Sequence, residues 1–247
     1  MAQHTTTTTG GTATTLAHGA ALRSVEAHDA APCAKNGEAA ERVTRSLLGY
    51  GVIAGPVYVT VSLAQAVTRD GFDLSRHAWS LLANGALGWI QITNFLVTGL
   101  MVLACAVGLR RAFGTGPAGR WAPRLVAVYG ASLLAAGVFR ADPALGFPAG
   151  TPEGPGEVSW HGVLHFAAGG VGFACLAAAC FVVARRYAAQ GRRGRARWSR
   201  ATGAVFLAGF AMLASSGGSE AGNLTFVAAV IAVWAWLSAV AADAYRR

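Results

Sequence analysis

Six apolar stretches constrain the fold of this chain more than any other feature of its sequence. They cover about residues 46–68, 89–109, 123–139, 162–184, 201–217 and 224–242. A bilayer core of about 30 Å is crossed by about 20 apolar residues in a helix, and lengths of about 17–25 residues are usual. Because lipid offers the backbone no hydrogen-bond partners, a spanning segment satisfies its own as a helix. The sequence therefore predicts an all-α polytopic membrane protein with a bundle of six transmembrane helices.

The composition agrees with this fold class and argues against others. Hydrophobic residues make up 54% of the chain and charged residues only 13%, whereas soluble domains carry about 25% charged residues. The formal net charge is +9, but the basic residues lie between apolar stretches and form no single basic domain. We therefore expect no nucleic-acid binding.

The N-terminal segment has a different character from the rest of the chain. Residues 1–44 begin with a threonine run at Thr5–Thr9 and continue with no helical or strand periodicity. They also lack the apolar core of a secretory signal. A segment of this kind buries too little apolar surface to offset its ordering entropy. We predict a disordered, Thr-rich cytoplasmic tail over residues 1–44, followed by a transmembrane domain over residues 45–247.

The distribution of basic residues predicts the orientation. Of the twenty Lys and Arg residues, only Arg69, Arg76 and Arg140 fall on one side of the predicted bundle, and seventeen fall on the other. Cytoplasmic loops accumulate Lys and Arg. We therefore expect a multi-pass protein of the cytoplasmic membrane with both termini in the cytoplasm. The loop Arg185–Arg200 holds seven arginines. It is expected either to contact anionic lipid headgroups of the bilayer or to act only as a determinant of topology.

Polar residues gather in the outer half of the predicted bundle, where their exposure to lipid would be costly. The second, third and fourth spans contribute six of them: Gln91, Asn94, Arg140, Asp142, His161 and His165. Residues 70–88 are predicted to form an amphipathic helix on the outer surface that carries His77 and Ser80. We expect the six residues to share one outer-facing cavity beneath that helix. Gln91, Asn94 and Arg140 are its candidate substrate-binding residues.

The first hypothesis for this site is a membrane-embedded zinc hydrolase. Three histidines and one water satisfy catalytic zinc, which lowers the pKa of the bound water to about 7. His77, His161 and His165 are the candidate metal ligands. A zinc ion is the one cofactor that the sequence suggests, and it belongs to this hypothesis alone.

The second hypothesis is a metal-free enzyme that acts on a lipid-like or isoprenoid small molecule by acid catalysis, as a cyclase or isomerase does. A desolvated Asp142 or Glu157 is its proton donor, because burial raises the pKa of a carboxyl group. Under the two enzymatic hypotheses, the catalytic candidates are Asp142, His161, His165 and Ser80.

The third hypothesis, which we favour, is a non-enzymatic transporter, sensor or partner subunit. Arg140, Asp142 and His165 then form a structural network, and Asn94 makes a hydrogen bond between helices. This hypothesis requires no cofactor.

Glycines predict where helices approach one another closely. Small residues four apart let two helix backbones come together in a membrane. Gly51 and Gly55 form such a pair in the first span, and Gly169, Gly170 and Gly172 predict close approach of a neighbour to the fourth.

Several short motifs resemble a family of bacterial membrane proteins catalogued as domain of unknown function 998 (DUF998). The motifs lie at residues 69–73, 76–80, 88–95, 137–143, 146–148 and 161–165. The resemblance covers about Val43–Arg247 and leaves out the Thr-rich tail. It implies six helices in a cytoplasmic membrane, and it implies no particular activity.

Overall fold

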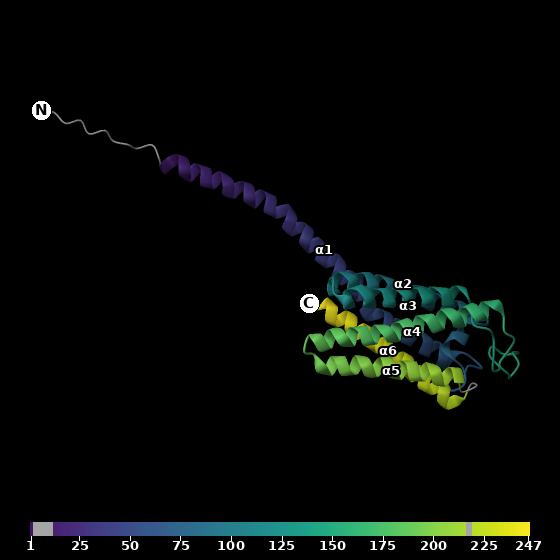
Figure 1. Ribbon diagram of the computed structural model, residues 1–247. Coiled ribbons are helices and arrows are strands. Elements are labelled where there is room, and N and C mark those ends of the chain that lie inside the picture. Colours follow the sequence, from purple (N-terminus) through teal and green to yellow (C-terminus); the bar gives the residue numbers. More distant parts are fainter. Residues whose placement is uncertain (2–11, 216–218) are drawn as a thin grey trace. The chain divides into compact units, whose positions relative to one another are not determined.

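The computed structural model describes residues 1, 12–215 and 219–247, and it describes side chains at Met1 and from residue 37 onward within those ranges. The described chain is helical, which confirms the all-α prediction. Its elements are α1 (Thr12–Thr68), the 3-10 helix η1 (Trp79–Ala83), α2 (Gly88–Phe113), α3 (Pro117–Val138), α4 (Trp160–Ala189), α5 (Arg193–Ser215) and α6 (Glu220–Tyr245) (Figure 1).

The chain forms two compact units, Met1–Val43 and Thr44–Arg247. Within the first unit, α1 is helical from Thr12, where the composition predicts disorder. The many alanines of this segment favour a helix, because alanine has the highest helix propensity of all residues. Residues 2–11 of the tail lie outside the described residues, and the absence of stable packing in the tail stays a prediction.

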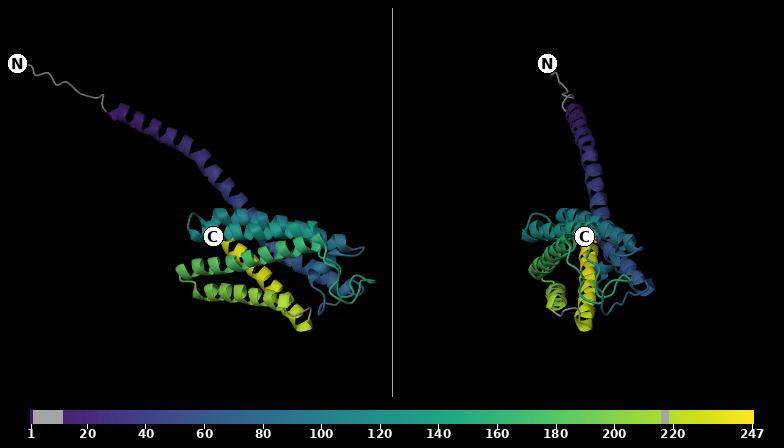
Figure 2. Two further views of the ribbon diagram at one scale, coloured as in Figure 1. Left: turned by 45° about the vertical axis from the view of Figure 1, so that its right-hand side comes forward. Right: turned by 90° about the vertical axis from the view of Figure 1, so that its right-hand side faces the viewer.

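Helices that are consecutive in the sequence pack side by side in the second unit. Contacts join α2 to α3, α3 to α4, α4 to α5 and α5 to α6, and α2 also contacts α6. α6 runs obliquely across the other helices (Figure 2). The part of α1 after Thr44 packs against both α2 and α6, since Gly51 approaches Cys105 of α2 and Ala241 of α6. The bundle is thus closed by its first helix.

Five helices are long and apolar enough to cross a membrane, namely Gly37–Thr68 of α1 together with α2, α3, α4 and α6. α5 is not among them, since Arg193, Arg195, Arg197 and Arg200 stand in its first turns. The sequence predicts a sixth span at residues 201–217. The structure supplies a helix there up to Ser215 that packs on both α4 and α6, and its crossing of the membrane stays a prediction.

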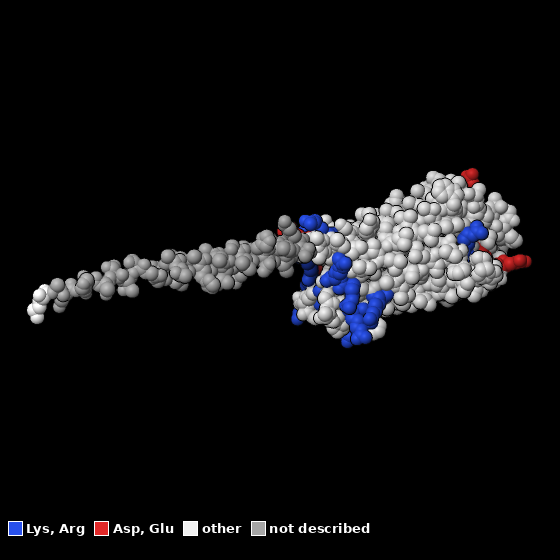
Figure 3. Space-filling view, turned by 90° about the horizontal axis from the view of Figure 1, so that it is seen from above, with Lys and Arg blue, Asp and Glu red and all other residues white. Residues whose placement is uncertain are grey.

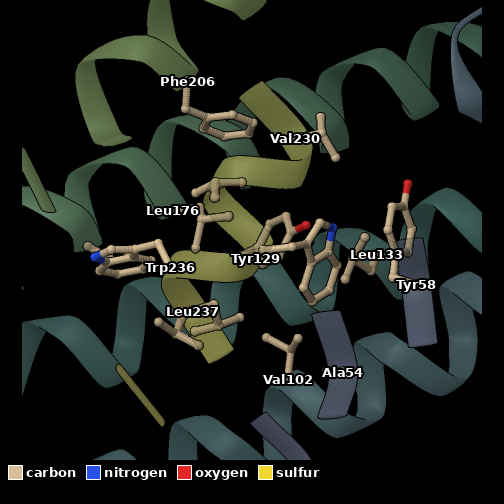
Figure 4. Packing of buried hydrophobic residues seen from close by; sticks show 14 of the residues in the cluster. Ala54, Tyr58, Val102, Tyr129, Leu133, Leu176, Phe206, Val230, Trp236 and Leu237 are labelled. Atoms are coloured by element: carbon tan, nitrogen blue, oxygen red, sulfur yellow. The ribbon is translucent and has the colours of Figure 1, made fainter. Parts of the chain in front are cut away.

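The core of the bundle is apolar, and every helix contributes to it. Figure 4 shows Val102 of α2, Leu176 of α4 and Phe206 of α5 packed around α6. Trp234 and Trp236 of α6 are the largest side chains that are fully buried. Burial of large aromatic side chains contributes strongly to packing because of their area.

Most of the predicted close approaches are present. A side chain at Gly55 would collide with Trp234 and Ser238 of α6, and one at Gly172 would collide with Ser132 of α3. The prediction is wrong for Gly169 and Gly170, however. Among the described residues, no heavy atom outside the local backbone lies within 4 Å of a Cβ built on Gly169, and the only one near Gly170 is the Phe210 ring edge at 3.9 Å. These two glycines border open space.

The loops at one end of the bundle contact one another, and we call this end of the bundle the η1 end. There α1 and α3 terminate and η1, α2, α4 and α6 begin. Residues 70–88 form no amphipathic surface helix, so that prediction is wrong. η1 is only five residues long, and Trp79, Leu81, Leu82 and Ala83 are buried. The carbonyl groups of Leu82 and Asn84 accept hydrogen bonds from Arg69, which holds this segment against the bundle.

Candidate functional site

An apolar cavity lies inside the bundle near the η1 end. Its volume is about 100 Å³. All six α-helices and η1 contribute to its wall, and eight of the lining residues carry phenyl, phenol or indole rings: Tyr58, Trp79, Phe95, Tyr129, Phe166, Phe173, Phe210 and Phe226. Small-molecule sites have mostly apolar walls with a few polar groups, and the wall of this cavity is of that kind.

The polar groups of the cavity are few and uncharged. Ser80, Ser132 and His165 line it, and Ser132 donates its hydroxyl proton to the Tyr129 carbonyl at 2.8 Å. His165 is buried, and its Nδ1–H donates to the Phe139 carbonyl at 2.9 Å. Since a carbonyl only accepts, this bond places a proton on Nδ1. The lining residues, all in the described part of the chain, include no Lys, Arg, Asp or Glu.

The cavity reaches the surface of the bundle along α4. Phe166 lines the cavity and is 67% exposed. One turn further along the helix, Gly169 and Gly170 leave the space open beside Phe210 of α5. Toward the other end of the two helices, by contrast, a side chain at Gly203 would collide with Cys180. α4 and α5 are therefore in close contact at one end and leave a gap at the other.

None of the three predicted substrate-binding residues lines this cavity. Gln91 and Asn94 are buried between α1 and α2, where they bond with Ser62 and Gln65. The Gln91 Oε1 accepts from Gln65 Nε2 at 2.8 Å, and Asn94 Nδ2 donates to the Tyr58 carbonyl at 3.1 Å. These are hydrogen bonds between helices inside an apolar bundle, as the third hypothesis predicts for Asn94.

His77 is buried between two loops and both of its ring nitrogens are engaged. Its Nδ1 accepts from the Asp73 N–H at 2.8 Å, and its Nε2–H donates to the Leu145 carbonyl at 2.9 Å. Asn223, near the start of α6, donates to the carbonyl groups of Leu74 and His77. His77 thus ties residues 69–87 to the loop between α3 and α4.

Arg140, Asp142 and His161 line a second, polar cleft together with Asn84 and Ser159. Asp142 accepts from the hydroxyl of Ser159 at 2.5 Å and from its N–H at 2.8 Å. The Ser159 side chain in turn accepts from Gly162 N–H at the start of α4. A carboxylate at this position suits the positive end of the helix dipole. Asp142 therefore holds the N-terminus of α4.

The predicted site is thus divided among separate places. Ser80 and His165 line the apolar cavity, and Gln91 and Asn94 join α1 to α2. His77 joins two loops, and Arg140, Asp142 and His161 line the polar cleft. The structure therefore does not bring these residues into the single shared cavity that the sequence predicts. No group of three or more His, Cys, Asp or Glu side chains in the described residues is arranged to hold a metal ion, so the three histidines do not form the expected donor set. The catalytic roles stay predictions.

Charged groups in the loops at the η1 end stabilise the loops. Arg69 stacks over the Phe147 ring at 4.9 Å, and its partial burial lowers its pKa. Arg76 pairs with Glu153 at 2.8 Å, and this bond raises the pKa of Arg76. Hydrogen bonds from the hydroxyl and N–H of Ser75 lower the pKa of Asp73. These loops cover the cavity, since Ala78, Trp79 and Ser80 form part of its wall.

Sequence reasoning misses the aromatic lining altogether. Phe173, Phe210 and Phe226 stand in apolar stretches where a phenylalanine facing lipid and one facing a cavity give the same pattern. The one available signal is the Gly169–Gly170 pair, which leaves space that no side chain fills.

Comparison with known proteins places the chain in a family. The family model described as protein of unknown function DUF998 matches residues 52–243. The chain belongs to the DUF998 family. This match confirms the resemblance drawn from the loop motifs, and it covers the whole bundle after the first turns of its first transmembrane segment. No curated protein and no solved structure matches the chain. The DUF998 chain is a multi-pass membrane protein by its family and its apolar helices.

Proposed function

We propose that this protein binds a lipid-like small molecule in the cavity at the η1 end of its bundle, as a non-enzymatic carrier or sensor. The observation that supports the proposal is an aromatic-lined cavity of about 100 Å³ in a membrane bundle. Closely packed interiors leave few voids larger than a water molecule. A void of this size is therefore a feature that a ligand would fill.

The wall of the cavity favours an apolar ligand over a polar metabolite. None of the residues that line it is charged, and its phenylalanine rings offer only dispersion and edge contacts. A polar molecule would leave its own hydrogen bonds unsatisfied there, which is costly. An acyl or isoprenoid chain would bury its surface without that cost.

The gap between α4 and α5 gives such a ligand a route from the bilayer. Phe166 is exposed on the side of the bundle that the surrounding lipid contacts, and the space beside Gly169 and Gly170 continues inward to Phe173. A molecule dissolved in the membrane reaches the cavity sideways without crossing water. This route suits a carrier or sensor of membrane-dissolved molecules.

We also propose that both termini are cytoplasmic and that the arginine-rich end of the bundle contacts anionic headgroups. Figure 3 shows Lys and Arg gathered at one end of the bundle on the face in view. Some of these arginines serve the fold, because Asp243 pairs with Arg192 at 2.6 Å and also with Arg195. Others, such as Arg193 and Arg197, are exposed. Each exposed basic residue near an anionic surface contributes about 1 kcal/mol.

The proposal is tested by filling the cavity. Gly170→Leu adds a side chain where, in the described part of the chain, only the Phe210 ring lies within 4 Å, so it occupies ligand space without a backbone collision. The purified protein in nanodiscs is titrated with a conjugated polyene hydrocarbon and with the polyene alcohol of the same length, whose fluorescence rises in apolar surroundings. We expect saturable binding to the native protein and at least tenfold weaker binding to Gly170→Leu.

Gly49→Leu is the matched control. Gly49 lies on α1, outside the cavity, and a Cβ there meets no atom of the described residues within 4 Å. Both substitutions raise helix propensity by a similar amount, so they should fold equally well. Equal binding by both variants, or no saturable binding of either polyene to the native protein, contradicts the proposed function.

A further inference from the structure

We propose that the arginine-rich end of the bundle carries a specific site for one anionic phospholipid. Its phosphate group would lie in a cleft beside the end of α6, and one acyl chain would lie in a groove between α1 and α6. The inference rests on that part of the proposed function which brings this end into contact with anionic headgroups, and it names the place and the ligand. Among the described residues, the aromatic cavity shares no lining residue with this cleft or this groove.

Arginines at this end of the bundle exceed the carboxylate that they share. Arg192 donates to both carboxylate oxygens of Asp243 at 2.6 Å, and Arg195 and Arg247 pair with the same carboxylate. Arg246 follows α6 directly and forms no ion pair among the described residues. Within this group of five residues, three positive charges are therefore left without a negative partner. An anion that binds here meets guanidinium groups that the fold already holds in place.

A cleft of about 300 Å³ lies beside this group of charges. It is lined by Tyr187, Arg195, Trp198, Ala239, Ala242, Asp243 and Arg246. Arg195, Trp198 and Arg246 are exposed. An exposed tryptophan is typical of the level where headgroups meet the apolar core, and the planar fork of arginine matches the oxygens of a phosphate. The cleft therefore suits a phosphate group at the membrane surface.

An apolar groove adjoins the cleft and follows α6 into the bundle. Its volume is about 490 Å³, and the described residues that line it are uncharged and belong to α1 and α6. Val52, Pro56 and Val59 contribute from α1. Ala239 and Ala242 line both the groove and the cleft, so the two spaces meet at these small residues. A ligand with a charged head and an apolar chain would fill both spaces at once.

The length of the groove matches an acyl chain in one leaflet of the bilayer. Along α6 it extends from Ala242 to Ile231, eleven residues away, which is about 16 Å at 1.5 Å per residue. Half of a bilayer core of about 30 Å is about 15 Å. Ala242 is also the end of the groove nearer to Arg246, so a phosphate in the cleft leaves its chain directed toward the membrane centre. A free phosphate would occupy the cleft and leave the groove without a ligand.

The test measures lipid binding to the full-length protein in detergent by native mass spectrometry. The probes are phosphatidylglycerol, phosphatidylcholine with the same acyl chains, and glycerol phosphate, which has no acyl chain. We expect the first phosphatidylglycerol to bind at least about fivefold more tightly than phosphatidylcholine, because choline adds a positive charge beside the arginines. Glycerol phosphate at the same concentration should not displace the lipid, since it makes no apolar contact in the groove.

Two variants with matched controls separate the headgroup from the chain. Arg246→Gln should weaken the binding of phosphatidylglycerol at least about tenfold, since it removes hydrogen bonds to a charged group. Arg193→Gln removes the same charge from an exposed residue outside the cleft, and it should change binding by less than about twofold because salt screens a distant charge. Ala239→Leu fills the junction of cleft and groove and should weaken binding at least about fivefold. Ala228→Leu, at an exposed alanine of α6 outside both spaces, should leave binding unchanged.

Each outcome bears on a different part of the inference. If Arg246→Gln and Arg193→Gln weaken binding equally, the attraction is diffuse and the specific site is wrong, although the proposed headgroup contact stands. If Ala239→Leu binds as Ala228→Leu does, or glycerol phosphate displaces the lipid, the groove holds no acyl chain and the phospholipid assignment is wrong. If phosphatidylglycerol and phosphatidylcholine bind the native protein equally, the preference for an anionic lipid is wrong. If the native protein retains neither lipid, the proposed headgroup contact itself fails. The lipid comparison uses the native protein, so a variant that folds poorly does not obscure it.

Discussion

Replacing Gln91 by leucine should loosen the first two transmembrane helices. Gln91 Oε1 accepts from Ser62 Oγ, Gln65 Nε2 and Asn94 Nδ2, and its own Nε2 donates to Ser62 Oγ. Hydrogen bonds between membrane helices average about 0.6 kcal/mol each. Loss of the three bonds that join Gln91 to Ser62 and Gln65 of α1 destabilises the protein by about 2 kcal/mol, which is roughly a thirtyfold change in the unfolding constant.

The assay is the free energy of unfolding in bicelles, measured by steric trapping. Thr93→Leu is the control on the same helix, since Thr93 is exposed, and it should change stability by less than about 0.5 kcal/mol. A double variant, in which Gln65 is replaced together with Gln91, should recover part of the lost stability because fewer donors are then left without a partner. If Gln91→Leu is as stable as Thr93→Leu, the cluster does not hold the helices together. Weaker ligand binding at unchanged stability would favour the substrate-binding role predicted from the sequence.

Three further outcomes follow from the topology, the tail and the loops. Reporter fusions at Gly150 and Gly194 should lie on opposite sides of the membrane, outside and inside respectively, and the same side for both would overturn the placement of α4. Deletion of residues 1–40 should leave melting in detergent within error of the full-length chain, whereas a large decrease would show that the tail packs. Asp73→Ala should lower the melting temperature slightly at pH 7. Because hydrogen bonds lower the pKa of Asp73 in the folded protein, that difference should be fully present above the ordinary aspartate pKa of about 3.9. It should decrease below that pH and vanish once pH has fallen through the lower pKa of the folded protein; a difference that does not decrease below about pH 3.9 contradicts this origin.

The fold could be predicted largely from the sequence because its signal is long and repeated. Each apolar stretch exceeds what a soluble core requires, and arginines such as Arg69 and Arg185 mark where stretches end. The predicted starts and ends of α2 and α4 lie within a few residues of the observed helices. The weakest stretch, at residues 201–217, is also the one whose helix misses the criterion for a membrane span. Length and apolarity thus predict elements well.

The site could be predicted less well because depth in the membrane does not determine which way a side chain points. Gln91 and His165 lie at similar distances from the ends of their helices, yet one faces α1 and the other lines the cavity. Asp142 is polar and near the same level, but it holds the start of α4. The short motif around His77 suggested a surface helix because His77, Ser80 and Asn84 recur at helical spacing. Instead, the side chains of Arg69 and Asn223 donate hydrogen bonds to backbone carbonyl groups of this segment and hold it against the bundle.

Photolabelling gives the most direct measurement of the central claim, that the cavity holds a membrane-dissolved ligand. A fifteen-carbon alcohol with a diazirine near the chain end is added to the protein in nanodiscs, and labelled peptides are identified by mass spectrometry. The account predicts saturable labelling between Gly169 and Phe173 of α4 and near Phe210 of α5, with loss of both in Gly170→Leu. Labelling that is spread over the lipid-facing surfaces of all helices and is unchanged in Gly170→Leu would contradict it.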